Sequence, residues 1–166
     1  MSSKFQQQLQ RIFRYLCITM NFFIPFFSSV YSGRKFSPPI NIVAANGHLE
    51  IVQLLMAVTN NPNVASNNGW TPIHSAACNG YLEIVQILMT STTNPNVADN
   101  FGKSPIHFAA QNGHLEIVRL LMKTSNNPNA PDNSGMTPEN LAFQNGHHGI
   151  VRLLRNLAII RSLLEL

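Results

Sequence analysis

Residues 68–74 of this 166-residue chain read NGWTPIH, and a related heptapeptide, FGKSPIH, follows 33 residues later at 101–107. A weaker copy, SGMTPEN, stands at 134–140 after the same interval. A fixed step of this length predicts a stack of similar small units rather than one irregular core. A second phrase keeps the same step, as NGHLEIV, NGYLEIV, NGHLEIV and NGHHGIV at residues 46–52, 79–85, 112–118 and 145–151.

The fixed positions of each unit predict two helices joined by a tight reversal. Thr71 is an N-cap residue whose hydroxyl accepts a backbone N–H of the first turn, and Pro72 suits the next position because a missing N–H costs nothing there. Gly80 then ends the short helix and reverses the chain. A second helix starts near Leu82, with an apolar stripe too wide for a helix that has one neighbour. The equivalents of the first three residues in the next unit are Ser104, Pro105 and Gly113.

The segments between units predict turns. An Asn-Pro-Asn triplet follows each of the first three second helices, and the residue before a proline avoids helical geometry, so the helix ends there. Asp99 followed by Gly102 three positions later is typical of a type I turn. Each unit therefore reads turn, short helix, reversal, longer helix and loop. The triplets occupy residues 61–63, 94–96 and 127–129.

These residues resemble the ankyrin repeat, whose motif is G-x-T-P-L-H-x-A-A-x-x-G-H-x-E-I-V-x-x-L-L. Residues 102–122 match the motif nearly throughout, and the resemblance extends roughly over residues 34–155. It implies an all-α ankyrin-repeat solenoid of about four stacked helix-turn-helix units joined by hairpin-like loops. We expect a leader at 1–35 and a repeat domain at 36–166, with units at about 36–66, 67–99, 100–132 and 133–166.

The chain departs from the ankyrin motif at both ends. Residues 38–41 read PPIN where the motif has Thr-Pro-Leu-His, which weakens the prediction of a first helix in that unit. In the last unit Phe143 replaces the second alanine and Arg155 replaces a core leucine. A solenoid has no neighbour beyond its last unit, so we interpret these replacements as a cap. The apolar residues 157–164 either extend the last helix or fold back as a lid.

Charge and motifs disfavour several classes of function. The pI is about 9.4, but residues 1–35 contain five basic and no acidic residues, whereas 36–166 contain six basic and seven acidic. The repeat region therefore has no basic stripe for phosphates, and we expect no nucleic-acid partner. Since no phosphate loop, nucleophile elbow or carboxylate pair appears, we expect neither an enzyme nor a cofactor.

Two interpretations of residues 1–35 stay open. The uncharged segment 15–33 is rich in phenylalanine and follows three basic residues, as in a secretory signal or a membrane anchor. The other interpretation is an apolar cap over the first repeat, or a disordered leader. Cys17 and Cys78 form no disulfide framework, which favours an intracellular setting. We expect a cytoplasmic or nuclear protein, with membrane or secretory targeting through residues 1–35 as the alternative.

The repeated histidines invite a catalytic or metal interpretation that their spacing disfavours. His74 and His107 lie one repeat step apart. The ankyrin resemblance implies that each hydrogen-bonds the neighbouring hydroxyl residue at the start of its helix. His147 and His148 have no cysteine or carboxylate at ligand spacing, so we predict no metal site.

Positions at which the repeats disagree are the candidates for function, because the scaffold does not fix them. In ankyrin proteins the hairpin tips and first helices line a concave groove, which implies that Trp70, Phe101 and Met136 form an apolar ridge for a partner. The alternative is that Trp70 and Phe101 only pack on neighbouring hairpins. The other candidate partner-binding residues are Lys103, Asn79, Gln111, Asn112 and Gln144.

We therefore expect a monomeric adaptor that binds another protein. The alternatives are a membrane-tethered ankyrin protein and a structural piece of a longer array. The resemblance also implies three candidate modification sites, since the equivalent hairpin asparagine is hydroxylated in some ankyrin proteins. These sites are Asn63, Asn96 and Asn129.

Overall fold

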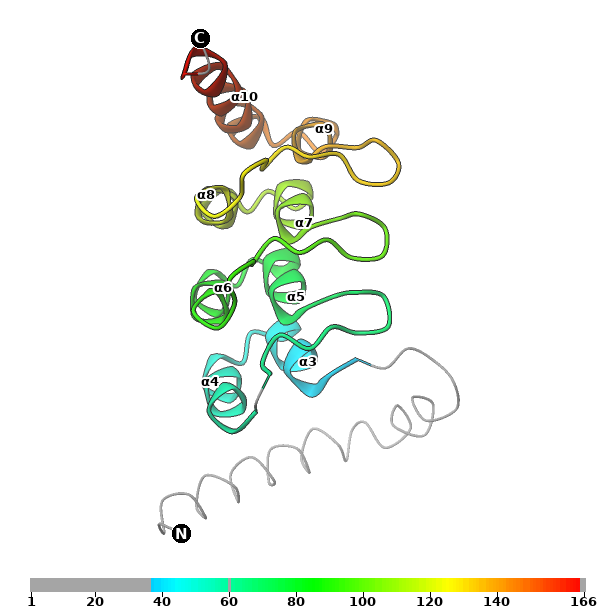
Figure 1. Cartoon of the computed structure of the whole chain (residues 1–166), viewed down its shortest axis with the longest axis vertical. Coiled ribbons are helices and arrows are strands. Elements are labelled where there is room, and N and C mark those ends of the chain that lie inside the picture. Colours follow the sequence, from blue (N-terminus) through cyan, green and yellow to red (C-terminus); the bar gives the residue numbers. More distant parts are fainter. Residues whose placement is uncertain (1–36, 60, 165–166) are drawn as a thin grey trace.

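The computed structural model describes residues 37–59 and 61–164, which form eight helices and no strand. Short and longer helices alternate along the chain and are labelled as in Figure 1. The first helices of the units are α3 (Pro39–Ala45), α5 (Pro72–Asn79), α7 (Pro105–Gln111) and α9 (Pro138–Gln144). The second helices are α4 (Leu49–Val58), α6 (Leu82–Met89), α8 (Leu115–Met122) and α10 (His148–Leu164).

The helices form two parallel rows, one of first helices and one of second helices (Figure 1). Each helix contacts the equivalent helix of the next unit, and α9 packs on α10 to close the last unit. The loops between units project beyond the row of first helices, on the side away from the second helices. The prediction of an all-α ankyrin-type solenoid is therefore confirmed.

The helix boundaries follow from the capping residues and the turn glycines. Thr71 has an extended backbone and forms a capping box with His74, while Pro72 occupies the first helical turn. Gly80 adopts φ +83°, and a Cβ atom built there would lie 2.6 Å from the ring of His114. The chain therefore needs glycine at the reversal for two reasons, which are the left-handed backbone and the ring of the next unit packed against it.

The first unit contains the helix that the sequence predicted only weakly. The proline doublet does not prevent α3, because Pro39 lies in the first turn, where no N–H is required. Asn41 stands at the histidine position and is buried, and its Nδ2 donates to the carbonyl of Trp70 at 2.6 Å. His74 makes the equivalent contact from Nε2 to the carbonyl of Lys103 at 3.1 Å. Asparagine thus replaces histidine in the link between neighbouring units.

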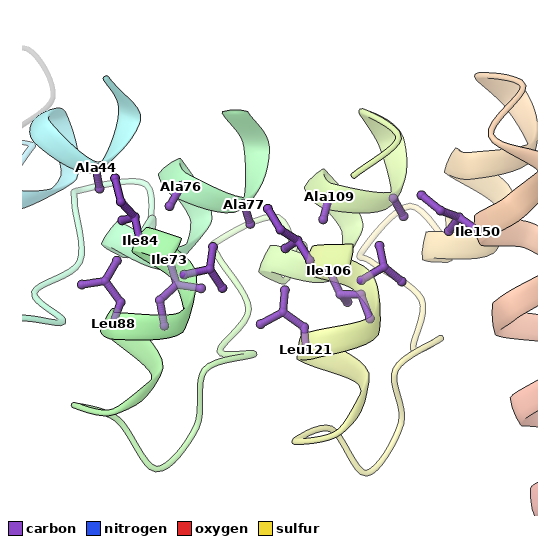
Figure 2. Close-up of a cluster of buried hydrophobic side chains, with 14 of the residues drawn as sticks. Ala44, Ile73, Ala76, Ala77, Ile84, Leu88, Ile106, Ala109, Leu121 and Ile150 are labelled. Carbon is purple, nitrogen blue, oxygen red and sulfur yellow. The ribbon is translucent and has the colours of Figure 1, made fainter. Parts of the chain in front are cut away.

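The core is a column of side chains between the two rows of helices. Figure 2 shows small residues of the first helices facing larger aliphatic residues of the units that pack on them. Ala76 and Ala77 are fully buried, as is Leu88 on the second helix of the same unit. Methyl-sized side chains let the first helices approach closely, and each fully buried aliphatic residue stabilises the stack by about 1.5–3 kcal/mol.

In the last unit Phe143 and Arg155, which depart from the ankyrin motif, are exposed to solvent. Arg155 is exposed and its Nε donates to Glu139 at 2.7 Å, while neighbouring Leu154 fills the core. Phe143 is 60% exposed, although the equivalent Ala110 is fully buried. Helix α10 continues to Leu164, so residues 157–164 extend the last helix and do not fold back as a lid.

The predicted leader at residues 1–35 lies outside the described residues. Across residues 37–59 and 61–164, no helix combines the length and apolarity that crossing a bilayer requires.

Candidate partner-binding face

An aspartate at the start of the second and third hairpin turns holds the loop rigid, whereas Ser66 stands at that position in the first turn. The Asp99 carboxylate accepts the backbone N–H groups of Phe101 and Lys103, both at 2.9 Å. The N–H of Asp99 in turn donates to the carbonyl of Lys103 at 2.8 Å. Asp132 binds its own hairpin in the same way, accepting the N–H groups of Ser134 and Met136 at 2.8 and 2.9 Å. Side chains at these tips are therefore carried on a fixed backbone.

Neighbouring hairpins are also bonded to each other. The N–H of Asn100 donates to the carbonyl of Asn68, and that of Asn133 donates to the carbonyl of Phe101, both at 3.0 Å. The side-chain amide of Asn100 adds a bond to the carbonyl of Asn67 at 2.9 Å. The hairpins and the first helices beneath them thus form one continuous surface, which we call the hairpin face.

Trp70 contacts the next unit along the chain. Its indole Nε1–H donates to Asp99 Oδ2 at 3.0 Å. Its ring meets Phe108 edge-on, with centroids 4.6 Å apart, and stacks near His74 at 6.0 Å. Part of this side chain therefore serves the packing of neighbouring hairpins, as the alternative interpretation of Trp70 required.

The repeated histidines lie under the hairpins as neutral structural groups. Nδ1 of His74 accepts the N–H of Thr71 at 3.1 Å, which leaves Nε2 as the donor to the carbonyl of Lys103. Burial lowers the pKa of His74 from 6.5 to about 4, and burial also lowers the pKa of His107. Nδ1 of His107 accepts the N–H of Ser104 in the same way, at 3.1 Å.

An open depression of about 570 Å³ lies on the hairpin face between three successive hairpins. Phe101 at its edge is 61% exposed. Lys103 reaches across it, with Nζ 3.9 Å from Asp132 Oδ2 and 5.9 Å from the centroid of the Phe108 ring. Aromatic walls, one ammonium and buried carboxylates suit recognition of a protein side chain. The lining residues are Asn68, Trp70, Asp99, Phe101, Lys103, Phe108, Asp132, Asn133 and Ser134.

Comparison with known families agrees with this architecture. A family model described as ankyrin repeats (3 copies) matches residues 15–99 and 88–161. The chain belongs to the ankyrin-repeat family. Ankyrin repeats are in general protein–protein interaction modules and are typically non-enzymatic. A search of curated proteins finds no match.

The depression brings together three of the eight candidate partner-binding residues, namely Trp70, Phe101 and Lys103. The other five do not line it. Asn79 and Asn112 end the first helices, where their Nδ2 groups donate to the carbonyls of Ser75 and Cys78 at 2.9 and 3.0 Å. The other three candidates outside the lining of the depression are Met136, Gln111 and Gln144.

Six of the nine lining residues were not among the candidate partner-binding residues, and three of these six, Phe108, Asp99 and Asp132, bring an aromatic ring or a charge to the depression. Phe108 stands where the preceding ankyrin unit has Ser75, so the disagreement between repeats was available as a signal. Asp99 was recognised only as a turn residue, and Asp132 occupies the same turn position one unit later. The Oδ2 atoms of both aspartates face the preceding unit. The spacing of residues along the sequence does not reveal such a contact between units.

The candidate hydroxylation sites lie in the loops that follow the second helices. Nδ2 of Asn63 donates to the carbonyl of Ser91, and Nδ2 of Asn96 donates to the carbonyl of Leu121, both at 3.0 Å. Asn129 accepts the N–H of Glu139 at 3.0 Å. Each side chain therefore ties its ankyrin unit to the next element, and their hydroxylation stays a prediction. Among residues 37–59 and 61–164, no three His, Cys, Asp or Glu side chains are grouped to hold a metal ion.

Proposed function

We propose that this ankyrin-repeat chain is an adaptor that binds one partner protein through the hairpin face. The observation that carries the proposal is the exposed ring of Phe101, which a rigid hairpin holds at the edge of the depression. An exposed aromatic side chain beside a hollow is a typical anchor for a partner, because its burial on binding costs little conformational entropy.

The expected contacts are short-range. Residues 36–166 are nearly neutral, with six basic and seven acidic residues, so the face has no large field to steer a partner over a distance. We therefore expect the association rate to change little between low and moderate salt. A steep loss of association with salt would contradict this part of the proposal.

The compartment that we propose is the cytoplasm or the nucleus. Support comes from the cysteine usage, since Cys17 and Cys78 are the only two cysteines of the chain. Fractionation of tagged full-length chain, compared with a version that lacks residues 1–35, tests it. Membrane association of the full-length chain alone would instead assign targeting to that segment.

Affinity capture from cells tests the adaptor role. The full-length chain is used as bait beside Phe101→Ala and the triple variant Trp70→Ala, Phe101→Ala, Met136→Ala. Both variants should retain helical content by circular dichroism and lose the partner that the unchanged chain captures. The result for Phe101→Ala is easier to interpret, because the Phe101 ring is exposed. Removing the Trp70 side chain also breaks its hydrogen bond to Asp99.

The matched control places three alanines on the opposite face. Gln86, Arg119 and Lys123 are exposed residues of the second-helix row, and their triple replacement should leave capture unchanged. Loss of the partner in this control with no loss in Phe101→Ala would assign binding to the second-helix face and refute the proposal.

A further inference from the structure

The two buried aspartates beneath the hairpin face differ in one respect. Asp99 Oδ2 accepts the indole N–H of Trp70 at 3.0 Å. Asp132 Oδ2, one repeat later, is buried without a hydrogen-bond partner, and the nearest cation, Lys103 Nζ, lies 3.9 Å away. Oδ1 of the same carboxylate accepts three hydrogen bonds, from the N–H and hydroxyl groups of Ser134 and the N–H of Met136, so only Oδ2 has lost its hydration without gaining a donor.

On the basis of the proposed function, we infer that the depression recognises an arginine side chain of the partner, whose guanidinium donates to Asp132 Oδ2. The oxygen belongs to a residue that lines the depression and is only 6% exposed. The inference extends the adaptor role by assigning a side-chain chemistry to the partner.

Charge and shape in the depression favour a planar cation. Two carboxylates, Asp99 and Asp132, face one ammonium, so the lining residues have an excess of negative charge. Phe101 and Phe108 supply ring faces on which a guanidinium stacks. An alkylated ammonium without N–H groups would satisfy the charge but would leave Asp132 Oδ2 without a donor. Arginine brings both the plane and the donors.

Lys103 occupies this region in the free chain and must move when arginine binds. Its Nζ is too far from Asp132 for a hydrogen bond, and its side chain is partly exposed at 28%. Its contact with the Phe108 ring is also long, at 5.9 Å. An ion pair of this kind contributes little, so a donor with better geometry displaces it. Lys103 therefore acts as a competitor for the site.

Fluorescence of Trp70, the only tryptophan of the chain and a lining residue, reports binding directly. The probes are N-acetyl-arginine methylamide, its uncharged analogue N-acetyl-citrulline methylamide, and N-acetyl-glutamate methylamide, titrated into the full-length chain at constant ionic strength. Arginine should bind about tenfold more tightly than citrulline, because a charge-assisted hydrogen bond is lost with the neutral group. Glutamate should not bind.

Two variants give effects of opposite sign. Lys103→Gln should tighten arginine binding about two- to fivefold, the range that a weak exposed ion pair allows. Asp132→Asn retains Oδ1 for its hairpin but places an amide where Oδ2 was, and it should weaken arginine binding about tenfold or more. Lys123→Gln makes the same charge change on the second-helix face and should have no effect.

Equal binding of arginine and citrulline would overturn the inference, as would weaker arginine binding in Lys103→Gln. Preferential binding of the glutamate probe would assign the site to an anion instead. These outcomes are separable from the proposed function. A chain that captures its partner through Phe101 but does not distinguish arginine from citrulline keeps the adaptor role and loses this inference.

Discussion

Acidification should destabilise this ankyrin stack through His74. The imidazole is fully buried, its Nδ1 accepts the N–H of Thr71, and burial lowers its pKa from 6.5 to about 4. Between these two values the unfolded chain binds a proton that the folded chain does not. The free energy of unfolding is therefore highest above pH 6.5 and falls as the pH decreases towards 4.

The size of the effect follows from the two pKa values of His74. A pKa shift from 6.5 to about 4 lowers the free energy of unfolding by about 3 kcal/mol once the pH lies below both values. Between pH 7.5 and pH 5 the part lost is about 2 kcal/mol. Burial lowers the pKa of His107 too, which adds a loss of the same sign. The pKa of Asp132 is also lowered, but from 3.8, so its contribution is lost at lower pH.

The variant His74→Asn removes the titration and keeps the cap. The chain already has asparagine at the equivalent position of the last unit, where Asn140 forms a capping box with Thr137. Urea unfolding at pH 7.5, 6 and 5, followed by circular dichroism, should show a pH dependence about 2 kcal/mol smaller in the variant. The exposed His148→Asn serves as the control and should keep the full dependence. An unchanged pH dependence in His74→Asn would refute the assignment.

Two further pairs of variants test the stacking by urea unfolding. Gly113→Ala and Gly146→Ala share a positive φ, of +81° and +77°, but a Cβ at Gly113 would lie 2.6 Å from the His147 ring whereas one at Gly146 meets nothing. Backbone strain should lower the free energy of unfolding of both variants by about 1–2 kcal/mol. Gly113→Ala should lose clearly more, because its Cβ also meets the ring. Equal losses in the two variants would contradict the ring contact. Ala110→Phe should cost about 1–3 kcal/mol or more by overpacking, whereas Phe143→Ala at the equivalent exposed position should change stability by less than about 0.5 kcal/mol. A tolerated Ala110→Phe would contradict the close approach of the first helices.

The periodic part of the sequence predicted the fold because each repeated residue has a local function. Thr71 caps its helix, Pro72 lies in the first turn, and Gly80 takes the left-handed turn. These preferences act within a few residues of chain, so they are visible without coordinates. The first unit was predicted less well, because Asn41 reproduces the histidine contact with the next unit from a different side chain.

The candidate site was only partly predictable, because it depends on contacts between units. Disagreement between repeats identified Trp70, Phe101 and Lys103, which do line the depression. It gave no indication that Trp70 bonds to Asp99 on the next hairpin. It also missed Asp132, whose Oδ2 accepts no hydrogen bond, a difference from Asp99 that becomes apparent only when the two hairpins are compared in space.

The most direct test of the central claim is site-specific photo-crosslinking in cells. The photoreactive residue p-benzoyl-phenylalanine is placed either at Phe101 on the hairpin face or at Arg119, an exposed residue of the second-helix face. We predict a discrete partner adduct from position 101 and none from position 119. Adducts from position 119 alone would contradict the claim that this chain binds its partner through the hairpin face.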